Sequence, residues 1–179
     1  IPPLVALLHA GAESEAAESA VRALLILLDN PTNRDAIREA GAIPPLVALL
    51  HAGAESEAAE SAVRALLILL DNPTNRDAIR EAGAIPPLVA LLHAGAESEA
   101  AKNAAGALRN LACNNPTNQG AIREAGAIPL LVALLHAGAE SEAAKIAACA
   151  LRNLACNNPA NKDAIREAGA IPLFVALLH

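Results

Sequence analysis

The sequence contains almost no aromatic residues. Phe174 is the single aromatic residue among 179, and tryptophan, tyrosine and methionine are absent. The chain therefore offers little aromatic surface on which a flat ligand or a nucleic-acid base could stack. Because 54% of the residues are nevertheless hydrophobic, the core has to be built from alanine, leucine, isoleucine and valine. Such a core suits closely packed helices.

Positive charge and long apolar runs are also scarce. Lysine and arginine total 13 against 19 acidic residues, which gives a net charge of −6. Nucleic acid is not expected as a partner, because phosphate binding needs a basic surface. The apolar runs are interrupted by proline, arginine or histidine before they reach the roughly 20 residues of a membrane span, so no membrane contact is expected. No secretory signal is visible, although the chain does not begin with methionine.

Cysteine occurs three times, at Cys113, Cys149 and Cys156. Helix-packing distances place Cys113 and Cys156 about 10 Å apart in neighbouring repeats, and the helical rise separates Cys149 from Cys156 by a similar distance. Both separations are too long for a disulfide. We therefore expect three free thiols, which fits a reducing compartment such as the cytoplasm, or recombinant cytoplasmic expression. A reactive or metal-binding thiol is the alternative, and no Cys/His cluster supports it.

The chain is internally repetitive. Residues 1–42 and 43–84 are identical, residues 85–127 and 128–170 differ at six positions, and residues 171–179 begin a fifth copy. The period is 42 in the first pair and 43 in the second, with the extra residue inside the stretch CNNP. A period of this length with a helical pattern is typical of armadillo or HEAT-type repeats.

Each copy predicts three helices, as residues 73–115 illustrate. The first is expected to start at Asn75 as its N-cap and to end at Gly83. The second opens on Ile85-Pro86-Pro87, where proline is tolerated, and closes at residues 93–95. The third starts at Ser98. Its predicted buried stripe, spaced i, i+3, i+4, i+7, comprises Ala101, Ala104, Ala105, Leu108, Leu111 and Ala112.

This unit resembles the armadillo repeat. The resemblance rests on NPTNRDAIREAGAIPPLVALL and on ALRNLA at residues 107–112 and 150–155, and it extends over essentially the whole chain. It implies an all-α, right-handed solenoid whose third helices line the concave face. In the family's register, residues 1–179 form one solenoid with full repeats at 31–72, 73–115 and 116–158 and partial repeats at 1–30 and 159–179. The identical copies indicate a designed or consensus sequence, with recent natural duplication as the alternative.

No catalytic, cofactor or metal site is expected. The histidines recur once per repeat at the end of the second helix and cannot converge on one ion or substrate, so they are interpreted as helix-end donors. Glu13, Glu15 and Glu18 and their copies stand at the start of the third helix, where acidic residues are favoured. The sequence therefore predicts a protein that is not an enzyme. The histidines are His9, His51, His93, His136 and His179.

The resemblance also implies a candidate peptide site. In armadillo proteins that bind extended peptides, an asparagine on the third helix reaches the peptide backbone, and Asn110 and Asn153 match that position. Four residues earlier the family often carries tryptophan, but Gly106 and Cys149 stand there in this chain. This departure places peptide binding in doubt. The candidate peptide-binding residues are Asn110, Asn153, Arg109, Arg152, Lys102 and Lys145.

The clearest departure from the repeat lies in the third helices of the first two copies. There the stretch RALLILLDNP replaces GALRNLACNNP, so aliphatic side chains stand where Arg-Asn would be. They fall outside the predicted buried stripe of Ala17, Ala20, Val21, Leu24, Leu27 and Leu28. We expect one exposed apolar patch that mediates self-association, with a two-fold dimer as the favoured form. The predicted patch is Leu25, Ile26, Leu67 and Ile68, with a polar rim of Arg22, Arg64, Glu18 and Glu60.

Two alternatives remain open for this region. Loss of one residue could rotate the helix end by about 100° and bury the patch, but the Leu-Ile pair precedes the deletion and is expected to stay outside. Neither end of the array carries a polar cap, so the apolar surfaces around Leu4 and Phe174 are the other candidates for association.

Overall fold

The computed structural model describes residues 1–176, and these residues form helices without any strand. The all-α prediction is therefore confirmed. The helices are α1 (Pro2–Leu8), α2 (Glu15–Leu28), α3 (Pro31–Glu39), α4 (Ile43–Leu49), α5 (Glu57–Leu69), α6 (Asn75–Glu81), α7 (Ile85–Leu91), α8 (Glu99–Ala112), α9 (Pro116–Glu124), α10 (Ala127–Leu135), α11 (Glu142–Ala155), α12 (Pro159–Glu167) and α13 (Ala170–Ala176), with 3₁₀ turns η1 (Leu50–Ala52) and η2 (Leu92–Ala94).

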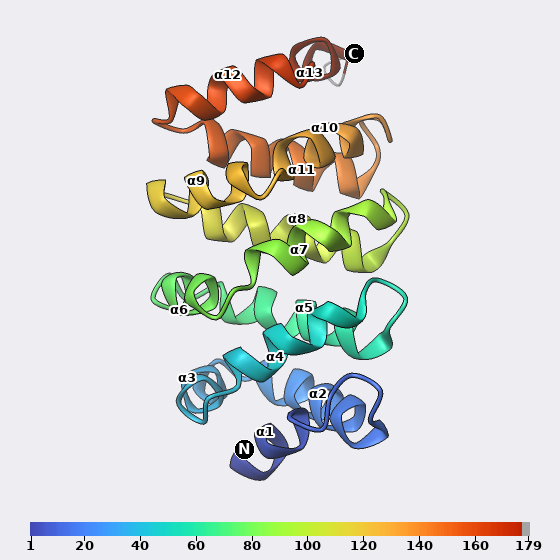
Figure 1. Cartoon of the computed structure of the whole chain (residues 1–179), viewed down its shortest axis with the longest axis vertical. Helices are drawn as coiled ribbons and strands as arrows, with labels where there is room; N and C mark the ends of the chain where they lie inside the picture. Colours follow the sequence, from blue (N-terminus) through green and yellow to red (C-terminus); the bar gives the residue numbers. More distant parts are fainter. Residues whose placement is uncertain (177–179) are drawn as a thin grey trace.

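The helices stack along one long axis with the two termini at opposite ends (Figure 1). Each interior unit contributes a short first helix, a second helix and a longer third helix. The third helices α2, α5, α8 and α11 pack on one another in sequence order and form a continuous column. None of the helices in residues 1–176 is both long and apolar enough to cross a membrane.

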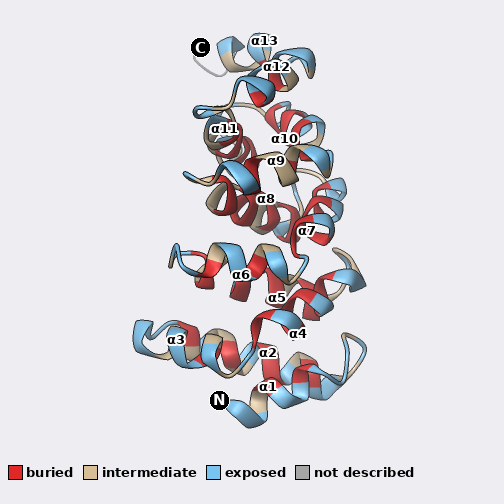
Figure 2. Ribbon diagram, turned by 60° about the vertical axis from the view of Figure 1, so that its left-hand side comes forward, coloured by how far each residue is buried: buried red, intermediate tan, exposed pale blue. Residues whose placement is uncertain are grey.

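The buried residues lie between the helices along the whole column (Figure 2). All six residues of the stripe predicted for α8 are fully buried, and the alanines among them let the neighbouring helices approach closely. The first copy differs at Leu27, which is only half-buried, whereas its counterparts Leu69 and Leu111 are buried. Within residues 1–176, α2 packs on the third helix α5 alone, whereas α5 and α8 each lie between two third helices.

The prediction that Asn75 caps the first helix is wrong. Asn75 is the first residue of α6 and is buried, and its Nδ2 donates to the carbonyl of Leu69 over 2.7 Å. The capping role belongs to the asparagine three residues earlier: Asn115 Oδ1, for example, accepts from the backbone N–H of Asn118 over 3.1 Å. The two asparagines at this spacing have different roles. The earlier one caps the new helix, and the later one donates to a carbonyl at the end of the preceding helix.

The extra residue of the 43-residue copies lies in a turn and not in a helix. Asn114 and Asn157 have φ values of 52° and 54°, a left-handed conformation that asparagine tolerates better than most residues. Helices α2 and α8 each have 14 residues and end at equivalent positions, Leu28 and Ala112. Helix α5 ends one residue earlier, at Leu69, which still lies beyond its Leu-Ile pair. The missing residue therefore leaves the helical part that carries the Leu-Ile pairs in place.

Both ends of the described chain expose apolar side chains, as the absence of polar caps predicts. Ile171 in α13 is 54% exposed, while Ile128 at the same repeat position is 2% exposed because further helices pack over it. Residues 177–179, which include the predicted His179, lie outside the described part of the chain.

Candidate interaction surface

A hollow of about 390 Å³ opens between the third helices α2 and α5. It lies where the two copies of RALLILLDNP run side by side, so the structure brings most of the predicted patch together. Asp29 and Ser61 also line it; neither was predicted from the sequence, although Asp29 stands one turn beyond Ile26. The lining residues are Arg22, Leu25, Ile26, Asp29, Ser61, Arg64 and Ile68.

Ile26 is the most exposed large apolar side chain among residues 1–176, with 73% of its surface accessible. Its helix is anchored by Leu24 and Leu28, which are fully buried on the opposite side. A residue two positions from each of them lies about 200° around the helix and must therefore project outward. Leu25 and Ile68 are half-buried beside it. We call these three residues, Leu25, Ile26 and Ile68, the Ile26 surface.

Leu67 is not part of the Ile26 surface, although the repeat pattern predicted it in the apolar patch. It is half-buried and does not line the hollow. Its two Cδ atoms lie 3.4 Å from the position that a Cβ on Gly106 would occupy, so Leu67 lies over the glycine of the next third helix. Leu25 has no such place available, because the residue equivalent to Gly106 in α5 is Arg64. The same side chain thus turns toward the next repeat in α5 and lines the surface hollow in α2.

Charged residues border one side of the Ile26 surface. Arg22 forms ion pairs with Glu18 on its own helix and with Glu57 of α5. A second hollow of about 350 Å³, lined mainly by polar groups, adjoins the first and is lined by Arg22, Glu57, Glu60, Ser61 and Arg64. The structure therefore brings all four predicted rim residues to this region, and it adds Glu57.

The candidate peptide-binding residues also cluster, on α8 and α11. Asn153 Nδ2 donates to the carbonyl of Arg109 over 3.0 Å, and Arg109 Nε donates to Asn110 Oδ1 over 3.2 Å. Arg152 donates to Asn153 Oδ1 over 3.5 Å. Both asparagine amides are thus partly engaged within the chain. An extended peptide would have to compete with these contacts.

The two candidate lysines pair with carboxylates near the start of the same helices. Lys102 Nζ donates to Glu99 Oε1 over 2.7 Å, and this hydrogen bond raises the pKa of Lys102 above its usual 10.5. Lys145 lies 3.9 Å from Glu140, a longer and more exposed contact. Both cations are therefore partly neutralised by neighbouring acids.

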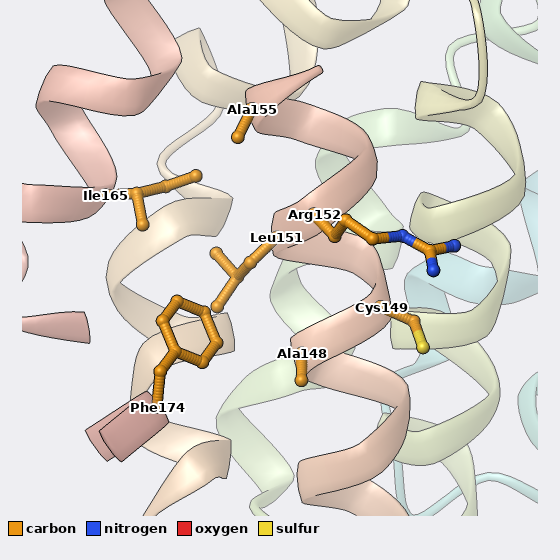
Figure 3. A pocket seen from close by; sticks show the side chains of 7 residues that line it. All are labelled: Ala148, Cys149, Leu151, Arg152, Ala155, Ile165 and Phe174. Carbon is orange, nitrogen blue, oxygen red and sulfur yellow. The ribbon is translucent and has the colours of Figure 1, made fainter. Parts of the chain in front are cut away.

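A second apolar hollow, of about 450 Å³, lies at the C-terminal end of the column (Figure 3). Ala148, Leu151 and Ala155 of α11 form one side of it, and Ile165 and Phe174 lie across from them. The equivalent face of α8 is covered by α11. This hollow is therefore the repeat interface left open at the last third helix, and Phe174, which replaces the leucine of earlier copies, partly fills it.

The remaining chemically active side chains do not converge. Within residues 1–176 there is no group of three or more histidine, cysteine, aspartate or glutamate residues that could hold a metal ion. The four described histidines are exposed at the ends of the second helices, as predicted. Cys113, Cys149 and Cys156 are free thiols in the structure.

Three consecutive segments, residues 29–71, 71–113 and 114–156, match the family model of the Armadillo/beta-catenin-like repeat. No curated protein matches the chain. Among solved structures it is similar to a designed armadillo repeat protein in complex with the peptide (KR)4, with 35% identity, a TM-score of 0.85 and coverage of 99% of this chain and 73% of that chain.

Computationally designed armadillo repeat proteins for modular peptide recognition give 36% identity and a TM-score of 0.83, covering 96% of this chain and 71% of theirs. An engineered protein gives 37% identity and a TM-score of 0.87, covering 99% of this chain and 43% of that one. A structure of the cadherin–β-catenin interaction, at 20% identity and a TM-score of 0.83, shares the fold. The chain belongs to the armadillo repeat family, as a repeat scaffold of the designed kind.

Proposed function

We propose that this chain is a non-enzymatic scaffold that forms a two-fold homodimer through the Ile26 surface. The observation that carries the proposal is the 73% exposure of Ile26 beside a hollow that Leu25 and Ile68 also line. A projecting side chain next to a hollow is self-complementary under a two-fold axis, since each copy offers what the other lacks. In the dimer each Ile26 enters the hollow of its partner.

The size of the surface favours a modest affinity. Complete burial of one isoleucine side chain contributes about 1.5–3 kcal/mol, and the dimer buries two copies of Ile26 together with parts of Leu25 and Ile68. Lost translational and rotational freedom costs on the order of 4–15 kcal/mol and offsets much of this gain. Because the two terms are of comparable size, we expect a weak dimer, with the polar rim contributing to orientation.

The arrangement of the repeats limits the assembly to a closed pair. The positions of Ile26 and Ile68 are occupied by Asn110 and Asn153 in α8 and α11, so the apolar surface does not continue along the column. A single patch per copy that pairs with itself closes after two copies, whereas a continuous stripe would permit open-ended growth.

Light scattering after size exclusion tests the proposal over a range of concentrations. The mean mass of the wild-type chain should rise from 18.2 kDa toward twice that value as the concentration is raised toward about 1 mM, where weak dimers form. Ile26→Arg combined with Ile68→Arg should return it to the monomer mass with unchanged helical circular dichroism. Leu7→Arg is a matched control, because Leu7 is also an exposed apolar residue but lies away from the hollow. A wild-type monomer at these concentrations would disprove the proposal.

Peptide binding along α8 and α11 is the second candidate function. It is supported by the placement of Asn110 and Asn153 on neighbouring third helices and by the similarity to a designed protein solved in complex with a peptide. An amide can pair with both backbone groups of an extended strand. Arg109 and Arg152, with Lys102 and Lys145, favour a peptide with acidic side chains. Binding of such a peptide, measured by fluorescence anisotropy, has to disappear in the double variant Asn110→Ala, Asn153→Ala for this function to hold.

A further inference from the structure

Arg22 and Arg64 occupy the same repeat position but have different surroundings. Arg22 is held by Glu18 and by Glu57 of the following third helix. The residues equivalent to these two carboxylates for Arg64 are Glu60 and Glu99. Glu99 is engaged by Lys102 over 2.7 Å, and within residues 1–176 no carboxylate lies within 4.0 Å of the Arg64 side-chain nitrogens. The guanidinium of Arg64 therefore borders the hollow with its charge uncompensated by a close ion pair.

Asp29 shows the same contrast with opposite sign. Its equivalent, Asp71, pairs with Arg34 over 3.3 Å, whereas the described residues provide no cation within 4.0 Å of Asp29. Asp29 is also the C-cap residue of α2, where the negative end of the helix dipole disfavours a carboxylate. An anion and a cation, each without an ion-pair partner among residues 1–176, thus line the hollow beside Ile26.

We propose that Asp29 of each copy pairs with Arg64 of the second copy when the Ile26 surfaces meet. This inference rests on the proposed function, since it names the polar contacts of the same dimer. A two-fold axis generates the pair twice, because a contact of Asp29 with Arg64 requires the reciprocal contact. Registers that place Arg64 opposite Arg64, or Asp29 opposite Asp29, are disfavoured by like-charge repulsion. The two charges therefore select one orientation from the several that an apolar patch alone would allow.

Charge reversal tests this pairing by sedimentation equilibrium. Asp29→Arg alone and Arg64→Asp alone should each weaken self-association by roughly tenfold or more, because each replaces two attractions by two repulsions. The double variant should return to within about threefold of the wild-type dissociation constant. Glu13→Arg provides the matched control for Asp29→Arg. It makes the same change in net charge at an exposed residue near the other end of α2, and should leave the dissociation constant unchanged.

Mixing the two single variants distinguishes a pair between two copies from a pair within one chain. In a mixed dimer, Arg at position 29 of one copy meets Asp at position 64 of the other, and native Arg64 meets native Asp29, so both pairs are restored. The mixture should associate with near wild-type affinity while each variant alone stays mostly monomeric. Rescue by the double variant without rescue by mixing would mean a pair within one chain and would overturn the inference. Single variants that dimerise normally would overturn it as well and leave the Ile26 dimer standing, whereas a monomeric wild type would remove both.

Discussion

Replacing Gln119 with leucine tests how strongly the third and fourth repeats are joined. Gln119 is buried, with 2% of its surface exposed, and sits at the start of α9 between the ends of α8 and α11. Its Nε2 reaches carbonyls of both third-helix segments, and its Oε1 accepts from Asn158 Nδ2 over 3.1 Å. The three carbonyl acceptors are those of Ala112 at 3.2 Å, Asn153 at 3.0 Å and Cys156 at 3.3 Å.

The expected loss in the free energy of unfolding is about 1–3 kcal/mol. Leucine has nearly the same volume as glutamine, so the change removes polar contacts without opening a large cavity. The Ala112 contact is fully buried, and the Ala112 carbonyl would keep only the longer hydrogen bond from the Asn115 N–H at 3.4 Å. Losing the glutamine donor therefore costs part of the roughly 1–3 kcal/mol of an unsatisfied buried carbonyl. The other contacts are only partly buried, so water can replace glutamine there and each adds a fraction of this cost.

The repeat supplies its own controls. Lys162 is the same position in the next copy and is exposed, so Lys162→Leu should change stability by less than about 0.5 kcal/mol. Gln119→Arg should be milder than Gln119→Leu, because Arg76 at this position donates to the carbonyl of Cys113 over 2.8 Å. Guanidinium unfolding followed by circular dichroism at a fixed protein concentration measures all three. Equal effects of leucine at positions 119 and 162 would refute the reasoning.

Two further predictions concern single residues. Gly120 lies inside α9 with nothing within 4 Å of the place that a Cβ would take, so Gly120→Ala should stabilise the chain by about 0.5–1 kcal/mol. Gly126 has a φ of 80°, so Gly126→Ala should destabilise the chain. The midpoints of thermal unfolding of the two variants have to shift in opposite directions. Glu99→Gln should lower the pKa of Lys102 in an NMR titration, since the hydrogen bond with Glu99 raises that pKa. Because the pKa of Lys102 in the folded chain lies above the usual 10.5, this pair stabilises the fold at neutral pH. The contribution disappears as pH rises through the pKa of the folded chain. An unchanged Lys102 titration in the variant would contradict the assigned cause.

Periodicity predicted most of the fold because each helix repeats one spacing rule in every copy. The stripe of α8, the proline-led second helices and the serine caps all follow from local preferences that neighbouring repeats reinforce. The cap of the first helix was harder, since Asn72 and Asn75 are both plausible from residue type. The three-dimensional position of the carbonyls at the end of α5 settles the question: the Asn75 side chain donates to the carbonyl of Leu69 and is not available to cap α6.

The candidate surface was only partly predictable for a related reason. The sequence indicated that Leu25, Ile26 and Ile68 lie outside the buried stripe, and the structure places all three at one hollow. The sequence could not indicate that Leu67 covers Gly106. The two residues lie about 40 positions apart, in the third helices of successive repeats, and their contact depends on how those helices pack. The ion pair of Arg22 with Glu57 was not predictable for the same reason, whereas Glu18 lies one turn away on the same helix and belonged to the predicted rim.

Identical sequence therefore does not mean identical chemistry in this array. Residues 1–42 and 43–84 are the same, yet Arg22 forms ion pairs and Arg64 forms none with the carboxylates of the described chain. Likewise, Leu25 faces a hollow while Leu67 covers a glycine. The difference comes from the following third helix, which is α5 for the first copy and the altered α8 for the second. A surface that distinguishes this chain thus arises at the junction between two kinds of repeat. Converting Gly106 and Lys102 to the residues of the earlier copies, Arg and Glu, should reproduce the Arg22-type ion pairs at Arg64 and displace Leu67 toward solvent, which would extend the apolar surface by one repeat.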